Sequence, residues 1–203
     1  MRAPDGSPVT VRWARPDDRA AIGEICRRTG DAGADATGTL VHGELYGLLW
    51  AEQYLVFEPS FALVADLEGV AHGYVLAAPD TVALEARLEE EWWPTLRDRY
   101  PLPGAGTAVD RRLVAYLHRP PRTPAAVTDR YPAHLHIDLL PELQGLGLGR
   151  QMIGAIEQRL RAAGCAGLHL GVDPRNEHAI GFYEHLGYTP HRADGTVLFT
   201  KRL

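Results

Sequence analysis

The clearest hydrophobic pattern in this chain is a strict alternation between residues 133 and 140. Three titratable side chains alternate there with three apolar ones, namely His134, His136 and Asp138 with Leu135, Ile137 and Leu139. Because successive side chains of a β-strand point to opposite faces, the alternation predicts a strand with one polar and one apolar face. Pro141 is expected to end the strand, since proline has no N–H to donate to a neighbouring strand.

A glycine-rich turn and a helix follow this strand. Residues 144–149 read Gln-Gly-Leu-Gly-Leu-Gly, and glycine is favoured where the backbone turns tightly or approaches another group closely. A helix over 147–163, ending at Gly164, is predicted from apolar residues at helical spacing: Leu148, Met152, Ile153, Ile156 and Leu160. Such a turn brings main-chain N–H groups to the positive end of a helix dipole. The stretch therefore predicts an anion site, most naturally for phosphate.

Two common phosphate loops do not fit this spacing. A dinucleotide-binding loop reads Gly-x-Gly-x-x-Gly early in a βαβ unit, whereas these glycines alternate with single residues late in the chain. A P-loop requires Gly-Lys-Ser or Gly-Lys-Thr, which the sequence lacks. A different class of phosphate ligand is therefore indicated.

Patterns on either side of this stretch predict the other elements. Strands are expected at residues 9–14, 61–66, 71–78 and 168–172, with a closing hairpin of 188–192 and 196–201 around Asp194-Gly195. Helices are expected over 16–30, with Asp18 at its cap, over about 43–54, and around 110–117.

Residues 79–132 differ from the rest of the chain, since they hold eight of its fifteen prolines. A helix interrupted at Pro94 is predicted there, from apolar residues that recur every four positions: Leu84, Leu88, Trp92 and Leu96. This spacing favours a place in the core for Trp92 and Trp93 over a binding surface. We interpret 79–132 as a helical, proline-rich insertion within a single domain of residues 1–203.

Composition and charge narrow the class of protein. The formal net charge of −5 and the lack of a basic run argue against nucleic-acid binding. Neither a signal-peptide core nor an apolar run of about 18 residues is present, so we expect no membrane contact and a cytoplasmic location. Cys26 and Cys165 are expected to be small buried residues in a reducing compartment, and homodimer formation stays open.

The glycine-rich turn resembles the pyrophosphate-binding loop of the GNAT N-acetyltransferases. That loop carries glutamine or arginine, then glycine, then glycine or alanine, at the spacing of Gln144, Gly147 and Gly149. The likeness continues downstream in four residues that keep the family's spacing: Asn176, Ala179, Phe182 and Tyr183. The strings at 28–37, 74–81 and 90–97 are similar to the acetyltransferase-like domain of O-GlcNAcases and to its free-standing bacterial relatives.

This resemblance implies an α/β fold of the GNAT type. Its mixed central sheet should have about seven strands, with flanking helices and a helical insertion before the central strand. The strands at 133–140 and 167–172 should run parallel and splay apart to admit the pantetheine arm of acetyl-CoA. The implied activity is an acyltransferase, in which acetyl-CoA is the cosubstrate and an amine acceptor attacks it directly in a ternary complex.

The resemblance also implies which residues bind acetyl-CoA. They are Leu139, Leu140, Gln144, Gly145, Leu146, Gly147, Leu148, Gly149, Arg150, Asn176, Phe182 and Tyr183. The Tyr183 hydroxyl is expected to protonate the leaving thiolate, and Asn176 to hydrogen-bond to the pantetheine arm. Main-chain groups of Leu139 and Leu140 would pair with that arm like an added strand.

The polar face of the central strand supplies candidates for the general base. An acceptor amine with a pKa of about 10.4 must lose a proton before it attacks, and His134, His136 and Asp138 follow one another about 7 Å apart. By resemblance, His134 corresponds in position to a histidine base of arylalkylamine acetyltransferases, whereas Asp138 would lie nearer the thioester. The pattern leaves open that these groups are only structural. A metal site built from them is disfavoured, because no fourth ligand lies nearby in sequence.

Two other functions stay open alongside the enzyme. One is a non-catalytic acetyl-CoA-binding or sensor module, and the other is a protein-interaction domain with a degenerate cofactor pocket. The complete loop of residues 144–149 argues against the second more than the first. The acceptor is not specified by the sequence, since a small amine, an amino acid, an antibiotic and a protein lysine all fit.

Overall fold

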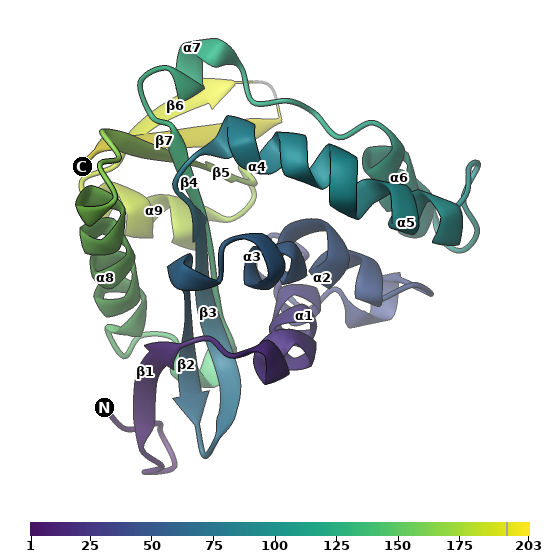
Figure 1. Ribbon diagram of the computed structural model, residues 1–203. Coiled ribbons are helices and arrows are strands. Elements are labelled where there is room, and N and C mark those ends of the chain that lie inside the picture. The colour runs from purple at the N-terminus through teal and green to yellow at the C-terminus, as the bar shows by residue number, and fades with distance from the viewer. Residues whose placement is uncertain (194) are drawn as a thin grey trace.

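The computed structural model describes residues 1–193 and 195–203. Its strands are β1 (Val9–Trp13), β2 (Ala62–Leu67), β3 (Val70–Ala78), β4 (Ala133–Leu139), β5 (Gly167–Val172), β6 (Thr189–Ala193) and β7 (Thr196–Arg202). They form one seven-stranded sheet in the order β1-β2-β3-β4-β5-β7-β6 (Figure 1). The predicted strands and the mixed sheet are confirmed, while Asp194 of the closing hairpin turn lies outside the described residues.

β4 lies where the pairing changes from antiparallel to parallel. β1 to β4 pair antiparallel in chain order, and β4 pairs parallel with β5 through the connecting helix α8 (Leu148–Ala162), as predicted. β3 and β4 are in register over six residue pairs, but β4 and β5 share only Ala133 with Leu168 and His134 with His169. Beyond these two pairs the strands part, and the sheet opens toward the C-terminal end of β4.

Helices cover both faces of the sheet (Figure 1). One face carries α8 and α9 (Glu177–His185), and the other carries α1 (Arg19–Arg28), α2 (Glu44–Trp50) and α3 (Glu52–Phe57). Alternate residues of β3 contribute to two separate cores: Tyr74 and Leu76 pack with α1 to α3, whereas Val75 packs with α8. β3 is therefore buried on both faces from Gly73 to Ala78, and the polar side chains of β4 are half-buried.

The first two helices differ from their predicted bounds. Pro16–Asp18 forms a 3₁₀ turn, and α1 begins only at Arg19. Asp18 makes no cap hydrogen bond to α1, because its carboxylate accepts from the Arg15 amide at 2.7 Å and pairs with Arg12 at 2.7 Å. The helix predicted over 43–54 is split at Ala51 into α2 and α3.

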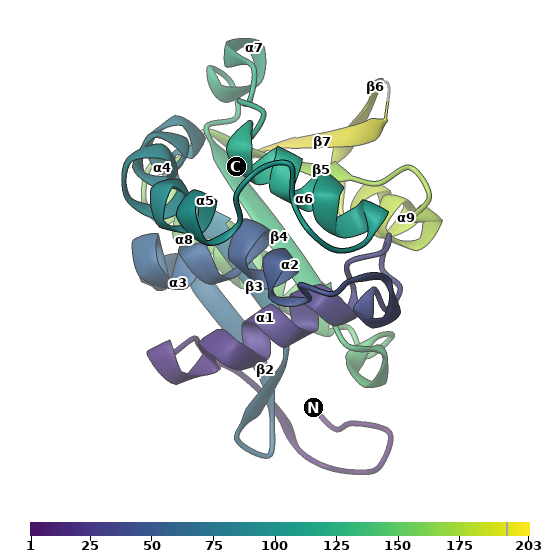
Figure 2. The same cartoon turned by 90° about the vertical axis from the view of Figure 1, so that its right-hand side faces the viewer.

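Residues 79–132 are largely helical, and residues 81–118 lie beside α2 and α3 (Figure 2). They contain α4 (Thr81–Arg87), α5 (Trp93–Arg99), α6 (Ala108–His118) and α7 (Ala125–Thr128). A π-helical turn, Leu88–Trp92, separates α4 from α5 and confirms the interruption predicted beside Pro94. Trp93 is buried, as predicted, and Trp92 is half-buried with its Nε1 donating to the Leu48 carbonyl at 3.0 Å.

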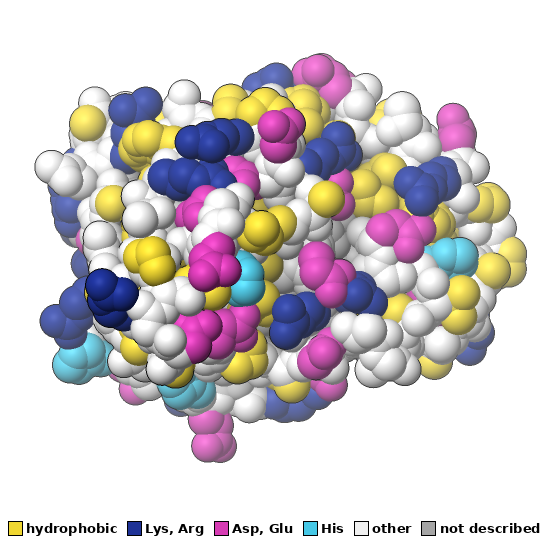
Figure 3. All heavy atoms as spheres, turned by 90° about the horizontal axis from the view of Figure 1, so that it is seen from below, with side chains coloured by type: hydrophobic (Ala, Val, Ile, Leu, Met, Phe, Trp, Pro, Cys, Tyr) yellow, Lys and Arg dark blue, Asp and Glu magenta, His cyan; other side chains and the backbone are white. Residues whose placement is uncertain are grey.

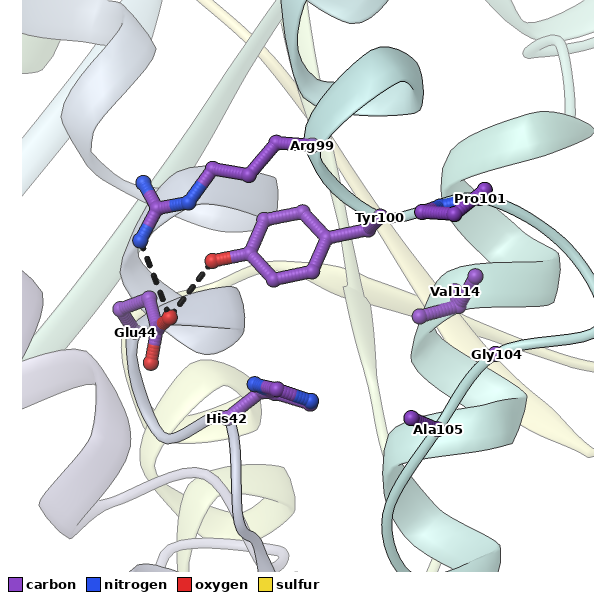
Figure 4. Close-up of a pocket in the computed structure, with 8 residues that line it drawn as sticks. All are labelled: His42, Glu44, Arg99, Tyr100, Pro101, Gly104, Ala105 and Val114. Atoms are coloured by element: carbon purple, nitrogen blue, oxygen red, sulfur yellow. Dashed lines mark hydrogen bonds and ion pairs between the residues drawn. The ribbon is translucent and has the colours of Figure 1, made fainter.

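A small cavity of about 420 Å³ lies where this insertion meets the start of α2. Figure 4 shows Tyr100 and Arg99 of the insertion pointing toward Glu44 of α2. The Tyr100 hydroxyl donates to Glu44 at 2.6 Å, and Arg99 lies 3.1 Å from the same oxygen. These three polar groups are thus satisfied by one another. We therefore interpret them as an interface that stabilises the packing of the insertion against α2, and not as a binding site.

Asp110 of α6 provides a second polar contact between the insertion and the segment before α2. Its side chain is fully buried and accepts hydrogen bonds from the amides of Val41, His42 and Thr107 at 2.7–3.0 Å. These bonds hold the segment before α2 against the insertion. They also lower the pKa of Asp110 to about 2 although burial opposes the shift, so the carboxylate is charged at neutral pH.

Replacing Asp110 with alanine is expected to lower the free energy of unfolding by about 2–4 kcal/mol, because buried amide donors lose their acceptor. Urea denaturation measures this change. Asp98→Ala is the matched control, since Asp98 is an exposed residue of the same insertion. If the two substitutions lower the free energy of unfolding equally, the hydrogen bonds of Asp110 do not stabilise the fold.

The face of the protein shown in Figure 3 carries no large patch of like charge. Acidic and basic side chains are interspersed there (Figure 3). Cys26 is buried, Cys165 is partly buried, and both thiols are free. Among the described residues, no helix has the combined length and apolarity that a membrane span requires.

Candidate functional site

A cleft of about 970 Å³ runs between the insertion, the α2–α3 helices and the point where β4 and β5 part. We call it the central cleft. Four of the predicted site residues on the strand and on α9 line it together: His134, His136, Asp138 and Tyr183. Asn176 lines it as well, at the start of α9.

The glycine-rich turn lies at the C-terminal end of β4 and opens toward solvent. Gly145 and Gly147 have φ values of +73° and +78°, a region that favours glycine, and a Cβ on either would meet nothing within 4 Å. The first main-chain bond of α8 runs from the Gln151 amide to the Gly147 carbonyl at 3.1 Å. In the described part of the chain, the amides of residues 145–150 have no acceptor. Six free amides at a helix N-terminus fit an anion such as pyrophosphate.

Gly149, the third glycine of the turn, is required for close packing and not for a positive φ. A Cβ on Gly149 would lie 3.0 Å from Cζ of Phe182, so its absence lets α9 pack closely against α8. Leu148 is buried and Leu146 packs partly against the same core, which anchors the turn. Arg150 points outward and lies 2.5 Å from His185 of α9.

Main-chain groups at the end of β4 already have partners within the protein. The Leu140 amide donates to the His72 carbonyl at 2.9 Å, and the Leu139 carbonyl accepts from Gln144 Nε2 at 2.8 Å. The bond of the Leu140 amide is made on the β3 side, away from β5, so only the bond to the Leu139 carbonyl would compete with a ligand strand in the gap.

His134 is held between two protein groups. Its Nε2 lies 2.6 Å from the Tyr54 hydroxyl, and its Nδ1 lies 2.7 Å from Thr81 Oγ1. Thr81 donates its single hydroxyl proton to the Pro132 carbonyl at 2.7 Å, so it accepts from His134. His134 thus carries its proton on Nδ1, and its Nε2 lone pair accepts from Tyr54. Burial, with smaller effects of two neighbouring histidines, lowers the pKa of His134 and keeps it neutral.

His136 has no such partners. Its ring faces Tyr54, with 5.9 Å between the ring centroids, and no described residue forms a hydrogen bond with it. Burial lowers the pKa of His136 to about 4, so the neutral ring presents a free lone pair to the central cleft. In the described chain, no group of three or more His, Cys, Asp or Glu side chains is placed to hold a metal ion.

Asp138 is paired with a tyrosine that sequence reasoning missed. The Tyr74 hydroxyl donates to the Asp138 carboxylate, and the two residues are register partners on β3 and β4. Burial raises the pKa of Asp138 to about 7, although the bond from Tyr74 acts in the opposite direction. Burial also raises the pKa of Tyr74, so it stays a donor. Only the register of the two strands could have identified it from the sequence.

Tyr183 reaches the central cleft from α9. Its ring packs among Phe182, Tyr188 and Phe199, with 5.4 Å between ring centroids in each pair. Its hydroxyl has no partner among the described residues. Burial raises the pKa of Tyr183, and the nearby charge of Asp138 adds to this. The phenol therefore keeps its proton at neutral pH and can give it to a more basic group.

Asn176 is the N-cap residue of α9, and only one of the two polar atoms of its side chain is hydrogen-bonded to the described residues. Its Oδ1 accepts from the Ala179 amide at 3.0 Å, which caps the helix. Its Nδ2 lies against the loop before α2, because a Cβ on Gly33 would be 2.9 Å away from it. The N–H groups of this side chain have no acceptor among the described residues, so they are the groups left to donate to a ligand.

Comparison with known proteins gives one consistent family. The model of the acetyltransferase (GNAT) family matches residues 37–188. Protein O-GlcNAcase of Rattus norvegicus is 22% identical over 191 residues, which cover 91% of this chain and 20% of that protein. The chain thus spans about a fifth of the length of the curated relatives it matches.

Solved structures agree with this match. The crystal structure of SsHAT is 37% identical and superposes with a TM-score of 0.88, covering 96% of this chain and 98% of that one. The structure of yncA, a putative acetyltransferase from Salmonella typhimurium with its cofactor acetyl-CoA, is 18% identical with a TM-score of 0.56, covering 96% and 94%. At that identity the likeness concerns the fold alone.

Proposed function

Because the chain belongs to the acetyltransferase (GNAT) family, we propose that it transfers the acetyl group of acetyl-CoA to an amine by direct attack in a ternary complex. The family membership confirms the resemblance inferred from the glycine-rich turn. The observation that carries the proposal is the placement of Asp138 and Tyr183 on one cleft, where β4 and β5 part. A group that takes a proton and a group that gives one thus flank the gap in the sheet.

The glycine-rich turn supports acetyl-CoA as the cosubstrate. The free amides of residues 145–150 lie at the N-terminus of α8 and suit the pyrophosphate, and the open space beside Gly145 and Gly147 leaves room for it. The pantetheine arm, with its two amide groups, suits the gap between β4 and β5. The Asn176 side-chain N–H groups lie on the wall of the same cleft and can donate to it.

Tyr183 is suited to be the general acid. When the amine nitrogen bonds to the acetyl carbonyl carbon and the carbon–sulfur bond breaks, the electron pair stays on sulfur as a thiolate. The Tyr183 hydroxyl proton then passes to that sulfur. Because its pKa is raised and it has no partner among the described residues, the phenol keeps this proton until the thiolate forms beside it.

Asp138 is the best-placed general base of the three candidates on β4. A carboxyl with a pKa of about 7 is largely ionised just above neutrality and can take the proton that the attacking amine loses. His134 has its Nε2 lone pair occupied by Tyr54, which favours a structural role. His136 keeps a free lone pair, but with a pKa of about 4 it is a much weaker base.

Gly147→Asp is expected to lower the affinity for acetyl-CoA about a hundredfold or more, since it places a negative charge where the pyrophosphate would bind. Isothermal titration calorimetry with acetyl-CoA measures this. Gly164→Asp is a matched control, because Gly164 ends the same helix with a φ of +83° and equally open surroundings. Retained affinity in the Gly147 variant would refute the phosphate assignment.

A thiol-release assay over amines and peptides tests the activity itself. We expect release of free CoA that depends on both the amine and acetyl-CoA. Tight binding of acetyl-CoA without release on any amine would instead indicate the non-catalytic sensor module.

A further inference from the structure

We propose that the acceptor is an amine with a carboxylate on an apolar body, and that Arg112 and Tyr46 bind this carboxylate at the rim of the central cleft. The inference rests on the proposed acetyltransferase function and names its substrate class. It comes from the charges and the unpartnered groups that line the cleft.

Three arginines line the central cleft, and two of them are neutralised. Arg122 lies 3.6 Å from Glu85, and Arg175 lies 3.0 Å from Asp31 and 2.9 Å from Asp173. Arg112 of α6 is exposed and forms no ion pair or hydrogen bond with the described residues. It is therefore the cation of the cleft that is left for an anionic ligand.

Tyr46 supplies a second donor beside Arg112. Its side chain is 7% exposed and lines the central cleft, yet its hydroxyl bonds to no described residue. Among the described residues, Gln53 Oε1 is the only side-chain polar atom that is both buried and without a partner, so the Tyr46 hydroxyl is open to the cleft and a ligand can reach it. Arg112 reaches the same cleft from α6, which packs against α2, the helix that carries Tyr46. Burial raises the pKa of Tyr46, so its hydroxyl keeps the proton that it would donate. The two groups can donate together to one carboxylate.

An aromatic wall leads from this rim into the cleft. The Tyr46 and Trp50 rings have centroids 5.2 Å apart, and those of Trp50 and Tyr116 are 5.5 Å apart. Deeper in, Tyr54 stands against His136 on the β4 face that also carries Asp138. A molecule with its carboxylate at the rim would lay an apolar body along this wall and present its amine to the base.

The carboxylates of the cleft disfavour a polycationic acceptor. Asp31 and Asp173 are paired with Arg175, and Glu85 already accepts from the amide and hydroxyl of Thr123 at 3.0 and 2.8 Å. Asp138 is then the one carboxylate among the described residues of the cleft that could pair with a cationic group of the ligand. Because it is needed for the reacting amine, no carboxylate of the described cleft is available for a second cationic group. Charge complementarity therefore selects a carboxylated amine over a polyamine.

Matched acceptors test this directly. Each set has the same apolar body with the amine at one end and a carboxylate, a carboxamide or neither at the other: 4-(2-aminoethyl)benzoic acid, its carboxamide and 2-phenylethylamine, and 6-aminohexanoic acid, its carboxamide and pentylamine. We expect the carboxylate member to have the highest kcat/KM in at least one set. Arg112→Gln should lower its kcat/KM about 10- to 100-fold and change the carboxamide by less than about threefold. Tyr46→Phe should act in the same direction but less strongly.

Arg119→Gln is the control, since Arg119 is an exposed arginine at the end of the same helix and outside the cleft. The inference is overturned if Arg112→Gln lowers all members of a set equally. It is also overturned if the carboxamide or a lysine in a capped peptide is the better substrate. Where no member turns over, calorimetric titration of the carboxylates in the presence of CoA decides, and equal affinities in the wild type and Arg112→Gln overturn it.

The proposed activity and the proposed acceptor class are distinguished by different results. Acetyl-CoA binding together with a higher kcat/KM for an amine that lacks a carboxylate than for its carboxylated counterpart would keep the acetyltransferase proposal and reject the acceptor class. If the wild-type protein does not bind acetyl-CoA, the proposed function is rejected. In that case, the binding titration of the carboxylated amines still tests Arg112 and Tyr46.

Discussion

Replacing Tyr183 with phenylalanine is expected to lower kcat about 10²- to 10⁴-fold, the usual contribution of general acid–base catalysis. The variant keeps the ring that packs among Phe182, Tyr188 and Phe199, so the fold and the affinity for acetyl-CoA should change little. Steady-state thiol release gives kcat, and calorimetry gives the affinity. The reason for the loss is that the departing thiolate has no proton donor.

Tyr188→Phe is the matched control for this substitution. Tyr188 belongs to the same aromatic cluster, but its hydroxyl donates to Glu157 at 2.8 Å, away from the central cleft. Its loss should lower stability and leave kcat nearly unchanged. If Tyr183→Phe behaves like Tyr188→Phe, Tyr183 is a core residue and another group protonates the thiolate.

Asp138→Asn is expected to lower kcat/KM about 10²- to 10⁴-fold above neutral pH and to remove the acidic limb of the pH profile. The raised pKa of about 7 sets the sign: the carboxyl is protonated and inactive below it, so wild-type activity should rise with pH through about 7. A weakly basic acceptor, such as an alkoxyamine, keeps the titration of the substrate out of this window.

The neighbouring residues provide the comparison. His136→Gln should leave the limb in place, because a histidine with a pKa of about 4 would put the limb near 4 instead. Tyr74→Phe removes a donor that favours the ionised carboxylate, so it should move the limb to higher pH. A wild-type limb near 4 that His136→Gln abolishes would transfer the role of base from Asp138 to His136.

The sheet and the glycine-rich turn could be predicted from the sequence because their signals are local. Alternation along 133–140, glycines at 145 and 147, and the helical spacing after them each depend on neighbours within one element. The interruption beside Pro94 was predictable for the same reason. The split of the second helix at Ala51 was not, since Ala51 is an ordinary helix former.

The chemistry of the polar strand face depends on distant residues and could not be predicted. Without perturbation, a histidine has a pKa of about 6.5 and an aspartate a pKa of about 3.9. Burial reverses this order, with a pKa of about 7 for Asp138 and about 4 for His136. His134 is engaged by residues 80 and 53 positions away, Tyr54 and Thr81, which no spacing pattern along the strand reveals.

The parting of β4 and β5 also bears on how this protein avoids aggregation. Strand edges with unpaired main-chain groups recruit other strands, and proteins usually shorten, charge or cover them. Here the two free edges lie in the interior of the sheet, between β3 and β7, and the His134–His169 pair closes one end of the gap. The edge of a second folded sheet cannot enter such a gap, but a single extended chain can. The protein can thus keep two open edges for a slender ligand without offering them to another copy of itself.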